Sequence, residues 1–165
     1  MRKILVSVIV LLWSVNTMAQ EQLAFPFQGG KDVMNQFFKD SLIVSHDMVQ
    51  RRASGVVIFK FTADEQGRIS KMVIYYADDA ILAEPAIDAL KKSNRKWIIP
   101  NHEKFHDFII PFAFNFNPPP TEDAELQKEV YNYNRNHKPI ATTNQVPLDM
   151  ATLLPTVIIN YDVVE

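Results

Sequence analysis

The chain has 165 residues, no cysteine and a formal net charge of −2 at pH 7. Without cysteine, the fold has no disulfide to stabilise it and no thiolate ligands for a zinc site. The weakly acidic balance argues against a nucleic-acid partner, because such binding depends on lysine and arginine side chains that neutralise phosphates. The length suits a single domain with a hydrophobic core of its own.

The first 19 residues have the pattern of a cleaved secretion signal. Arg2 and Lys3 precede an apolar run over residues 4–13, and Thr17-Met18-Ala19 provides a small-x-small cleavage site. A membrane-spanning helix needs about 20 apolar residues, roughly twice the length of this run. A cleaved signal is therefore favoured over a retained anchor. We expect a periplasmic protein that begins at residue 20, with a net charge of −4 once Arg2 and Lys3 are removed.

Two short helices are predicted after the signal. Residues 31–39 carry an apolar stripe at helical spacing, formed by Val33, Met34, Phe37 and Phe38. Residues 45–52 favour a second helix, whose first turn Ser45 or Asp47 could cap. The aromatic stripe predicts that the first helix packs on a hydrophobic core.

From residue 55 the apolar pattern changes to a period of two, which predicts a hairpin of two antiparallel strands. Residues 64–67 have the polar, glycine-terminated composition of the hairpin loop. On one face of the first strand lie Val57, Phe59 and Phe61. In the second strand, residues 68–76, the pattern places Ile69, Val73 and Tyr75 on one face and Met72, Ile74 and Tyr76 on the other.

A longer helix and a third strand follow. Residues 81–94 carry apolar residues at spacings of three and four, with Pro85 early enough for a first turn. The basic residues at the end of this helix complement its carbonyl pole, so they need no ligand to explain them. Residues 108–116 form a strand with five apolar residues on one face, which are Phe108, Ile110, Phe112, Phe114 and Phe116.

These elements predict an α+β domain over residues 20–117, a three-stranded antiparallel sheet of β-β-α-β topology with helices packed on one face. The strand order second, first, third leaves the outer edge of the third strand unpaired. Such an edge is either blunted or used to accept a partner strand, and Pro111, which lacks an amide donor, fits an edge strand. The predicted partner-binding residues are Phe112, Ala113, Phe114, Asn115 and Phe116.

Six short motifs follow one another between residues 25 and 116. They are Phe27-x-Gly29-Gly30, Gly55-x-Val57-x-Phe59-x-Phe61, Gly67-x-Ile69, Leu82-x-x-x-Ala86, Lys96-Trp97-x-x-Pro100 and Pro111-Phe112-x-Phe114-x-Phe116. In this order and spacing they resemble the TonB C-terminal domain, in the form common in proteins of the Bacteroidetes type. The resemblance implies a protein-binding module that adds an extended peptide to its third strand, with a TonB-dependent outer-membrane transporter as a candidate partner.

The chain departs from this family in three respects. Val44-Ser45 stands where Tyr-Pro usually precedes the first strand, and Leu82-Ala83 stands where the helix normally starts Leu-Asp. The predicted signal is followed almost directly by the domain, without the anchor and proline-rich spacer through which TonB transmits force. We therefore expect a soluble periplasmic relative that binds, competes or scaffolds, unless residues 1–13 are retained and the protein associates with an anchored partner.

The prolines at residues 118–120 mark a boundary, and residues 118–165 form a C-terminal extension. Within it, residues 121–134 favour a short helix and residues 156–164 favour a strand. Three fates of this terminal strand are open. It pairs with the open edge of its own domain and blocks partner strands, it pairs with a second copy and builds a homodimer, or it stays loosely packed.

No catalytic residue, cofactor or metal site is predicted. His46, His102, His106 and His137 lack the spacing of a helical metal pair. The nearest approach to a ligand cluster is His102, Glu103, His106 and Asp107, for which a polar rim before the last strand is the preferred interpretation.

A second functional class remains open at this point, a small-ligand-binding or structural domain of the cell envelope. In that case Phe37, Phe38 and Trp97 would line an apolar site between helices and sheet. An unpaired third strand favours the strand-accepting module, whereas a closed apolar cavity with both sheet edges covered favours the second class.

Overall fold

The computed structural model describes residues 25–117, 124–136, 140–141 and 150–162. The predicted signal and the prolines at 118–120 lie outside these residues. The described helices are α2 (Gly30–Ser41), α3 (His46–Arg51), α4 (Ala80–Lys92) and α5 (Ala124–Asn136). The described strands are β1 (Gly55–Asp64), β2 (Ile69–Ala77), β3 (Phe105–Asn117), β4 (Ile140–Ala141), β5 (Thr152–Leu153) and β6 (Val157–Asp162).

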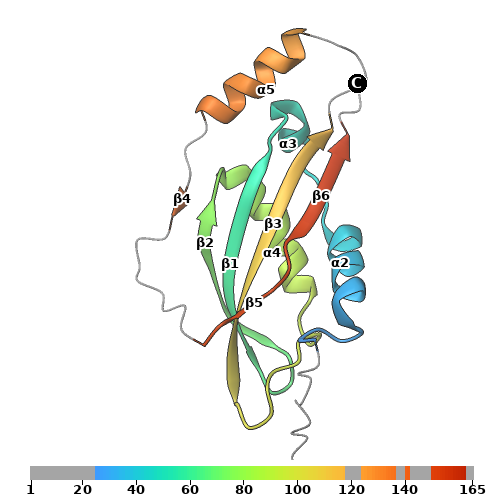
Figure 1. Cartoon of the computed structure of the whole chain (residues 1–165), viewed down its shortest axis with the longest axis vertical. Helices are drawn as coiled ribbons and strands as arrows, with labels where there is room; N and C mark the ends of the chain where they lie inside the picture. Colours follow the sequence, from blue (N-terminus) through green and yellow to red (C-terminus); the bar gives the residue numbers. More distant parts are fainter. Residues whose placement is uncertain (1–24, 118–123, 137–139, 142–149, 163–165) are drawn as a thin grey trace, which may run out of the picture.

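The described strands form one sheet (Figure 1). β1 pairs antiparallel with both β2 and β3, so the predicted order second, first, third is confirmed. The extension supplies three further strands: β4 pairs antiparallel with the outer edge of β2, and β5 and β6 pair parallel with the outer edge of β3. The prediction of three strands is therefore wrong, because the extension joins the sheet on both sides and brings it to six.

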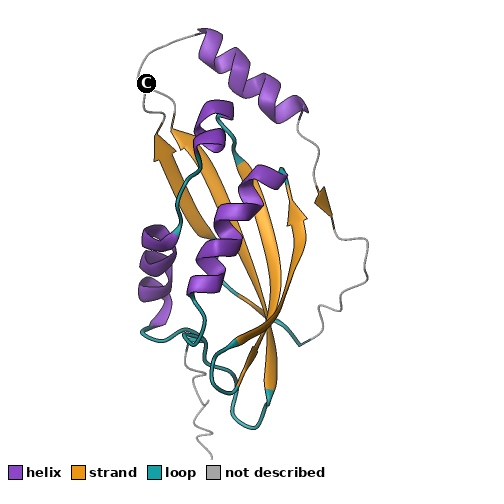
Figure 2. Ribbon diagram, turned by 180° about the vertical axis from the view of Figure 1, so that it is seen from behind, coloured by secondary structure: helices purple, strands orange, loops and turns teal. Residues whose placement is uncertain are grey.

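The helices α2 and α4 pack on one face of the sheet, as Figure 2 shows from the helix side. This arrangement confirms the predicted α+β class with helices on one face. The helix α5 confirms the predicted helix of the extension and lies near α3 at one end of the sheet (Figure 1). There Leu126 is buried, and Arg52 forms an ion pair with Glu129.

An aromatic core lies between the helix layer and the sheet. The ring of Trp97 lies 4.5 Å from Phe61, 5.1 Å from Phe27 and 5.4 Å from Phe108, measured between ring centroids. Its indole N–H donates to Ser93 Oγ at 3.0 Å, so the polar atom of this buried ring has a partner. From α2, Met34 and Phe38 are fully buried and Phe37 is partly buried, whereas Val33 is half exposed.

The hairpin loop depends on Gly67. Asp64 Oδ1 accepts hydrogen bonds from the amides of Gln66 and Arg68, both at 2.9 Å, and this arrangement turns the chain. Gly67 has a φ of +69°, and a Cβ placed there would lie 2.4 Å from the carbonyl oxygen of Trp97. The loop therefore packs against the chain after α4, which no residue with a side chain at position 67 would permit without displacement.

Two irregularities in β2 change which of its residues share a face. Residues opposite one another in an antiparallel pair lie on the same face. Tyr76, opposite Ile58, therefore lies on the helix-free face, and Ile74, opposite Phe59, lies on the helix face. The prediction that these two residues of β2 share a face is wrong, because a bulge adds one residue and reverses the alternation. A second register shift places Ile69, opposite Ala63, on the helix face and Val73, opposite Lys60, on the helix-free face, so the prediction that these two residues share a face is also wrong.

The helix ends follow the capping predictions with one correction. Ser45 Oγ accepts the amide of Met48 at 3.2 Å, which confirms Ser45 as the cap of α3. The helix α4 begins one residue earlier than predicted, after Asp79, whose carboxylate accepts the amide of Ile81 at 3.1 Å. Pro85 is therefore beyond the first turn, where it removes a helical N–H but is buried in the core.

Candidate strand-pairing site on β3

The predicted partner-binding residues occupy the C-terminal half of β3. Phe112 and Phe114 are fully buried on the helix face, and the ring of Phe112 lies 5.2 Å from that of Phe38. Ala113 and Asn115 alternate with them on the other face, where Asn115 is exposed. The phenylalanines therefore fix the strand to the core, so a partner strand meets its main chain.

The main-chain groups of β3 point alternately towards β1 and away from it. The carbonyl of Ile109 accepts the amide of Leu154 at 2.8 Å, so the main chain of Ile109 faces away from β1. Every second residue after it faces the same way, which gives Pro111, Ala113 and Asn115. Ala113 and Asn115 thus present both N–H and C=O groups at the outer edge.

This outer edge is occupied by β6, which belongs to the same chain. The two strands run parallel, with Phe112 opposite Val157 and Asn117 opposite Asp162. The prediction that the edge is unpaired is therefore wrong, and of the three fates open to the terminal strand, self-pairing is the one observed. The cause lies in the alternation of β6, which buries Val157, Ile159 and Tyr161 against the core beside α2 while its main chain completes the ladder.

Polar side chains define the register of β6. Asn115 donates to Asn160 at 3.2 Å, and two residues further on Asn117 donates to Asp162 at 3.0 Å. Both pairs lie on the helix-free face. A slip of one residue would turn the buried side chains of β6 towards solvent, and a slip of two would remove one of these pairs.

Tyr161 ties β6 to the segment at the end of α3, which is more than a hundred residues away in the sequence. Its hydroxyl donates to the carbonyl of Ala53 and lies 3.3 Å from the carbonyl of Met48. Both acceptors lie where α3 ends. Burial raises the pKa of Tyr161 to about 12, since the phenolate would lose its hydration there. Its ring also lies 6.1 Å from that of Phe116, so the ring and the hydroxyl both hold β6 in place.

Pro111 explains why two separate strands, β5 and β6, cover the edge of β3. β5 pairs with Phe108 and Ile109, and β6 pairs from Phe112 onwards. The missing N–H of Pro111 faces outwards between them, so a continuous ladder would lack a donor at this point. Leu154, which is buried, crosses the gap.

The loop before β3 brings together part of the predicted polar cluster. His106 is buried, and its Nδ1 lies 2.6 Å from Glu103 Oε2 while its Nε2 lies 2.7 Å from Thr152 Oγ1. The imidazole thus connects the loop to β5. Asp107 lies on the other face of β3, 2.8 Å from Lys60 Nζ. Among the described residues, no three histidine or acidic side chains converge on a metal site.

The carboxylate of Asp107 has its own partners. Burial raises its pKa, but hydrogen bonds from Lys60 and from the Thr62 hydroxyl, the latter at 2.6 Å, outweigh this effect and leave the pKa below its usual value. Lys60 is buried and forms this pair across two strands of the helix-free face. The pair supports the packing of β1 on β3.

The residues considered for an apolar ligand site fill the core with their own rings. Phe37 lies 5.3 Å from Phe38, and Phe38 lies 6.4 Å from Trp97. Open hollows on the described surface lie beside β2 and at residues 99–104, and both are lined by a mixture of polar and apolar residues. Among the described residues these rings pack on one another rather than around a ligand site, and β6 covers the edge that was expected to stay unpaired.

Comparison of the chain with models of known protein families found no match, and comparisons with curated proteins and with solved structures found none either. Within the described residues, no helix combines the length and the apolar character needed to span a membrane. The geometry of the sheet edges therefore carries the functional interpretation.

Three residues that shape this site were not singled out from the sequence. They are Tyr161, Asn160 and Asp162 of β6. The sequence contains a signal for two of them, since Asn115 and Asn117 share a spacing of two with Asn160 and Asp162. The hydroxyl contact of Tyr161 with residues more than a hundred positions away has no such signal.

Proposed function

We propose that this protein is an exported protein-binding module that accepts an extended peptide strand at the outer edge of β3, in place of its own β6. The observation that carries this proposal is the pairing of a short terminal strand with this edge, in register from Phe112 to Asn117. Strand addition uses main-chain groups for affinity and alternate side chains for selectivity. Ala113 and Asn115 supply the main-chain groups, and the sites of Val157, Ile159 and Tyr161 supply the selectivity.

The pattern of β6 describes the partner. A guest strand that replaces it runs parallel to β3 and carries apolar or aromatic residues at every second position. Between them, amide or carboxylate side chains would meet Asn115 and Asn117 as Asn160 and Asp162 do. The apolar side chains of such a guest would take the place of the buried side chains of β6, so the exchange need not expose the core.

The resemblance to the TonB C-terminal domain supports the proposal, because that family adds partner segments to its third strand. Two glycines of the shared motifs occupy positions that tolerate no side chain. Gly67 contacts Trp97, and a Cβ at Gly55 would lie 2.7 Å from Asp78, whose carboxylate accepts the amide of Val56. On this proposal the partner is an extended segment of a TonB-dependent outer-membrane transporter, and the protein acts in the periplasm.

The resident strand sets the affinity of the guest. Burying one side chain such as Val157 or Ile159 contributes about 1.5–3 kcal/mol, and a tethered segment competes at millimolar effective concentration. Since 1.4 kcal/mol corresponds to a tenfold change in affinity, β6 docking of about 3 kcal/mol weakens a guest roughly a hundredfold. Regulation by release of β6 follows directly from this competition.

The test compares the intact chain with a chain that lacks residues 156–165. The probe is a labelled synthetic peptide of residues 156–165, followed by peptides from the periplasmic segments of outer-membrane transporters. We expect the shortened chain to bind them about a hundredfold more tightly than the intact chain. Ala113→Pro in the shortened chain should abolish binding because it removes an outward N–H, whereas the matched Ala113→Ser keeps this donor and should bind.

Equal affinity of the intact and shortened chains would show that β6 does not compete. A shortened chain that is folded by circular dichroism but binds neither its own segment nor any transporter segment would remove the proposal. Should the shortened chain fail to fold, Ile159→Ser in the intact chain weakens β6 docking and serves the same comparison. Phe114→Pro is a poor probe, because Phe114 is buried and its main chain faces β1.

The closed edge of β3 favours a second candidate, a structural domain of the cell envelope in which β6 never leaves. The two functions differ in the hydrogen exchange of the Ala113 and Asn115 amides. Exchange through local release of β6 occurs at a lower free energy than global unfolding. Protection equal to that of the β1 core would favour the structural domain.

A further inference from the structure

We infer a second strand-accepting site on the opposite edge of the sheet, along β2, whose occupant is an extended acidic peptide segment of a partner protein. This site is distinct from the β3 edge and goes beyond the function proposed above. It is defined by Ile69, Ser70, Lys71, Met72, Lys91 and Asn94.

The edge has main-chain groups to offer. β4 pairs with β2 only at Tyr76 and Ala77, and the rest of β2 has no strand on that side in the described part of the chain. The carbonyl of Val56 accepts the amide of Asp78, so Val56 and every second residue after it in β1 face β2. Lys71 and Val73, opposite Thr62 and Lys60, therefore face β1, and the main chain of Met72 between them faces outwards.

The pairing of β4 shows that this edge takes a strand and sets its direction. β4 is antiparallel to β2, with Ala141 opposite Tyr76 and Ile140 opposite Ala77. A guest strand in line with β4 therefore runs antiparallel along β2 as far as Met72, because the amide of Ile69 already donates to Asn94 Oδ1 at 3.0 Å. The β2 sequence contains neither proline nor a carboxylate that would oppose such a guest.

The side chains beside this edge select for negative charge. An open hollow of about 390 Å³ lies between β2 and the end of α4. Its lining includes two lysines, Lys71 and Lys91, and no acidic residue. Lys91 has a nearby carboxylate, Asp88 at 3.4 Å, but both side chains are largely exposed, so this pair is weak. The exposed Lys71 forms no ion pair within the described structure.

The same charges disfavour a second copy of this chain as the occupant. Two β2 strands paired antiparallel would bring Lys71 and Lys91 of both copies into one edge, where like charges repel. A segment that alternates apolar and acidic residues avoids this. Its apolar side chains would cover Met72 and Ile69, which are half-buried on the helix face, and its carboxylates on the opposite face would meet the ammonium group of Lys71. Lys91 adds positive charge on the helix side of the same edge.

The test measures amide hydrogen exchange of the intact chain with two capped eight-residue peptides. The first alternates valine and glutamate, and the matched control alternates valine and lysine. We expect the acidic peptide at millimolar concentration to slow exchange of the Met72 amide at least tenfold, and the basic peptide to leave it unchanged. The double variant Lys71→Glu with Lys91→Glu should reverse this preference.

A second pair of variants tests the main-chain contact. Met72→Pro removes an outward N–H without breaking the ladder to β1, so the protein should stay folded and lose at least tenfold in peptide affinity. Met72→Leu keeps the donor and should retain binding. Should Met72→Pro unfold the protein, the reversed charge preference of the Lys71→Glu and Lys91→Glu double variant tests the inference by itself.

Three outcomes would overturn the inference: no protection at Met72, equal protection by both peptides, or unaltered binding to a folded Met72→Pro variant. Protection at Ala113 and Asn115 instead would assign the acidic peptide to the β3 edge. Protection of Met72 that rises with protein concentration in the absence of peptide would identify a second copy as the occupant. Removal of residues 156–165 should leave binding at β2 unchanged, which separates this site from the function proposed above.

Discussion

At the scale of single residues, Tyr161 joins the end of the chain to the first half of the domain. Its hydroxyl meets the carbonyls of Met48 and Ala53, where α3 ends with Arg52 in the left-handed region at a φ of 51°. Carbonyl groups at a helix end lack intrahelical donors and need other partners. The carbonyl of Met48 already accepts the amide of Ala53 at 3.0 Å, so the phenol chiefly satisfies the carbonyl of Ala53, just beyond α3, and fixes β6 at the same time.

Replacing Tyr161 by phenylalanine should lower the free energy of unfolding by about 1–2 kcal/mol, since it removes the hydrogen bond and leaves a buried carbonyl without its donor. The ring and its packing on Phe116 remain. Chemical denaturation measures the change. The matched control is Tyr131→Phe in α5, where the side chain is 62% exposed and no loss is expected. Equal effects of the two substitutions would contradict the role of the buried hydroxyl.

The raised pKa of Tyr161 predicts a dependence on alkaline pH. The folded state holds this proton up to a pKa of about 12, whereas an ordinary tyrosine releases it at 10.0. A raised folded pKa gives stability that is complete below pH 10 and is lost as the pH rises towards 12. The stability difference between the natural chain and Tyr161→Phe should therefore shrink over this window. A difference that stays constant would show that the hydroxyl is not buried in solution.

Gly67 and Gly30 provide a matched pair for the cost of a side chain at positive φ. Both have φ near +70° to +90°, but a Cβ at Gly30 meets nothing within 4 Å, whereas a Cβ at Gly67 meets Trp97 O at 2.4 Å. Gly30→Ala should lose about 1–2 kcal/mol from the left-handed conformation alone. Gly67→Ala should lose clearly more, because the chain after α4 must move. Thermal melts of both variants measure the difference, and equal melting temperatures would contradict the close approach.

At the scale of elements, the sequence predicts what depends on local patterns. The period of two in β1 and β3, the Ser45 cap and the strand-prone end of the chain are all found in the structure. The faces of β2 are not predicted correctly, because a bulge depends on the match between two strands and leaves no mark in either one. Edge occupancy likewise depends on contacts between β3 and residues over forty positions away.

The alternation within β6 predicts opposite outcomes for neighbouring isoleucines. Ile159 is 6% exposed and packs in the core, whereas Ile158 is 50% exposed on the helix-free face. Ile159→Ser should cost about 2–4 kcal/mol and speed hydrogen exchange at Ala113 and Asn115, because burial and the β3 ladder are both weakened. Ile158→Ser should change stability by less than about 0.5 kcal/mol. Similar losses at both positions would contradict the observed register.

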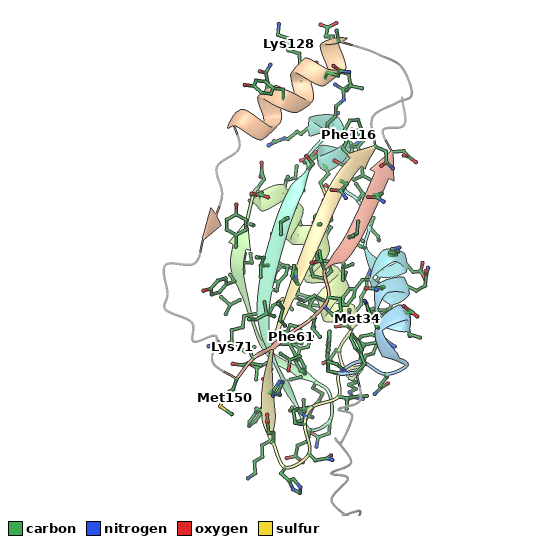
Figure 3. The ribbon with its side chains drawn as sticks, in the orientation of Figure 1. Met34, Phe61, Lys71, Phe116, Lys128 and Met150 are labelled. Atoms are coloured by element: carbon green, nitrogen blue, oxygen red, sulfur yellow. The ribbon has the colours of Figure 1, made fainter. Side chains whose placement is uncertain are left out.

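At the scale of the whole molecule, the extension is part of the fold. It contributes β4 to one edge of the sheet and β5 and β6 to the other, and Figure 3 shows side chains along both edges, from Lys71 near β2 to Phe116 at the end of β3. Covered edges protect a sheet from pairing with other chains. The two edges differ in their protection, since six residues of β3 are paired with β6 but only two residues of β2 are paired with β4.

Ending the chain after Asn117 should therefore reduce stability and cause association. The shortened chain keeps β1, β2, β3 and the helices α2 to α4, but it loses Leu154, Val157, Ile159 and Tyr161 from the core. We expect a loss of several kcal/mol in the free energy of unfolding, since each of these side chains contributes about 1.5–3 kcal/mol of burial. The bare edge of β3 should then pair between copies, which sedimentation detects as association that rises with concentration.

The control ends after Asp162 and keeps β6, so it should stay as stable and as monomeric as the intact chain. If a chain ending at Asn117 matched this control in both measurements, the extension would contribute nothing to stability, and the β3 edge would have no affinity for strands.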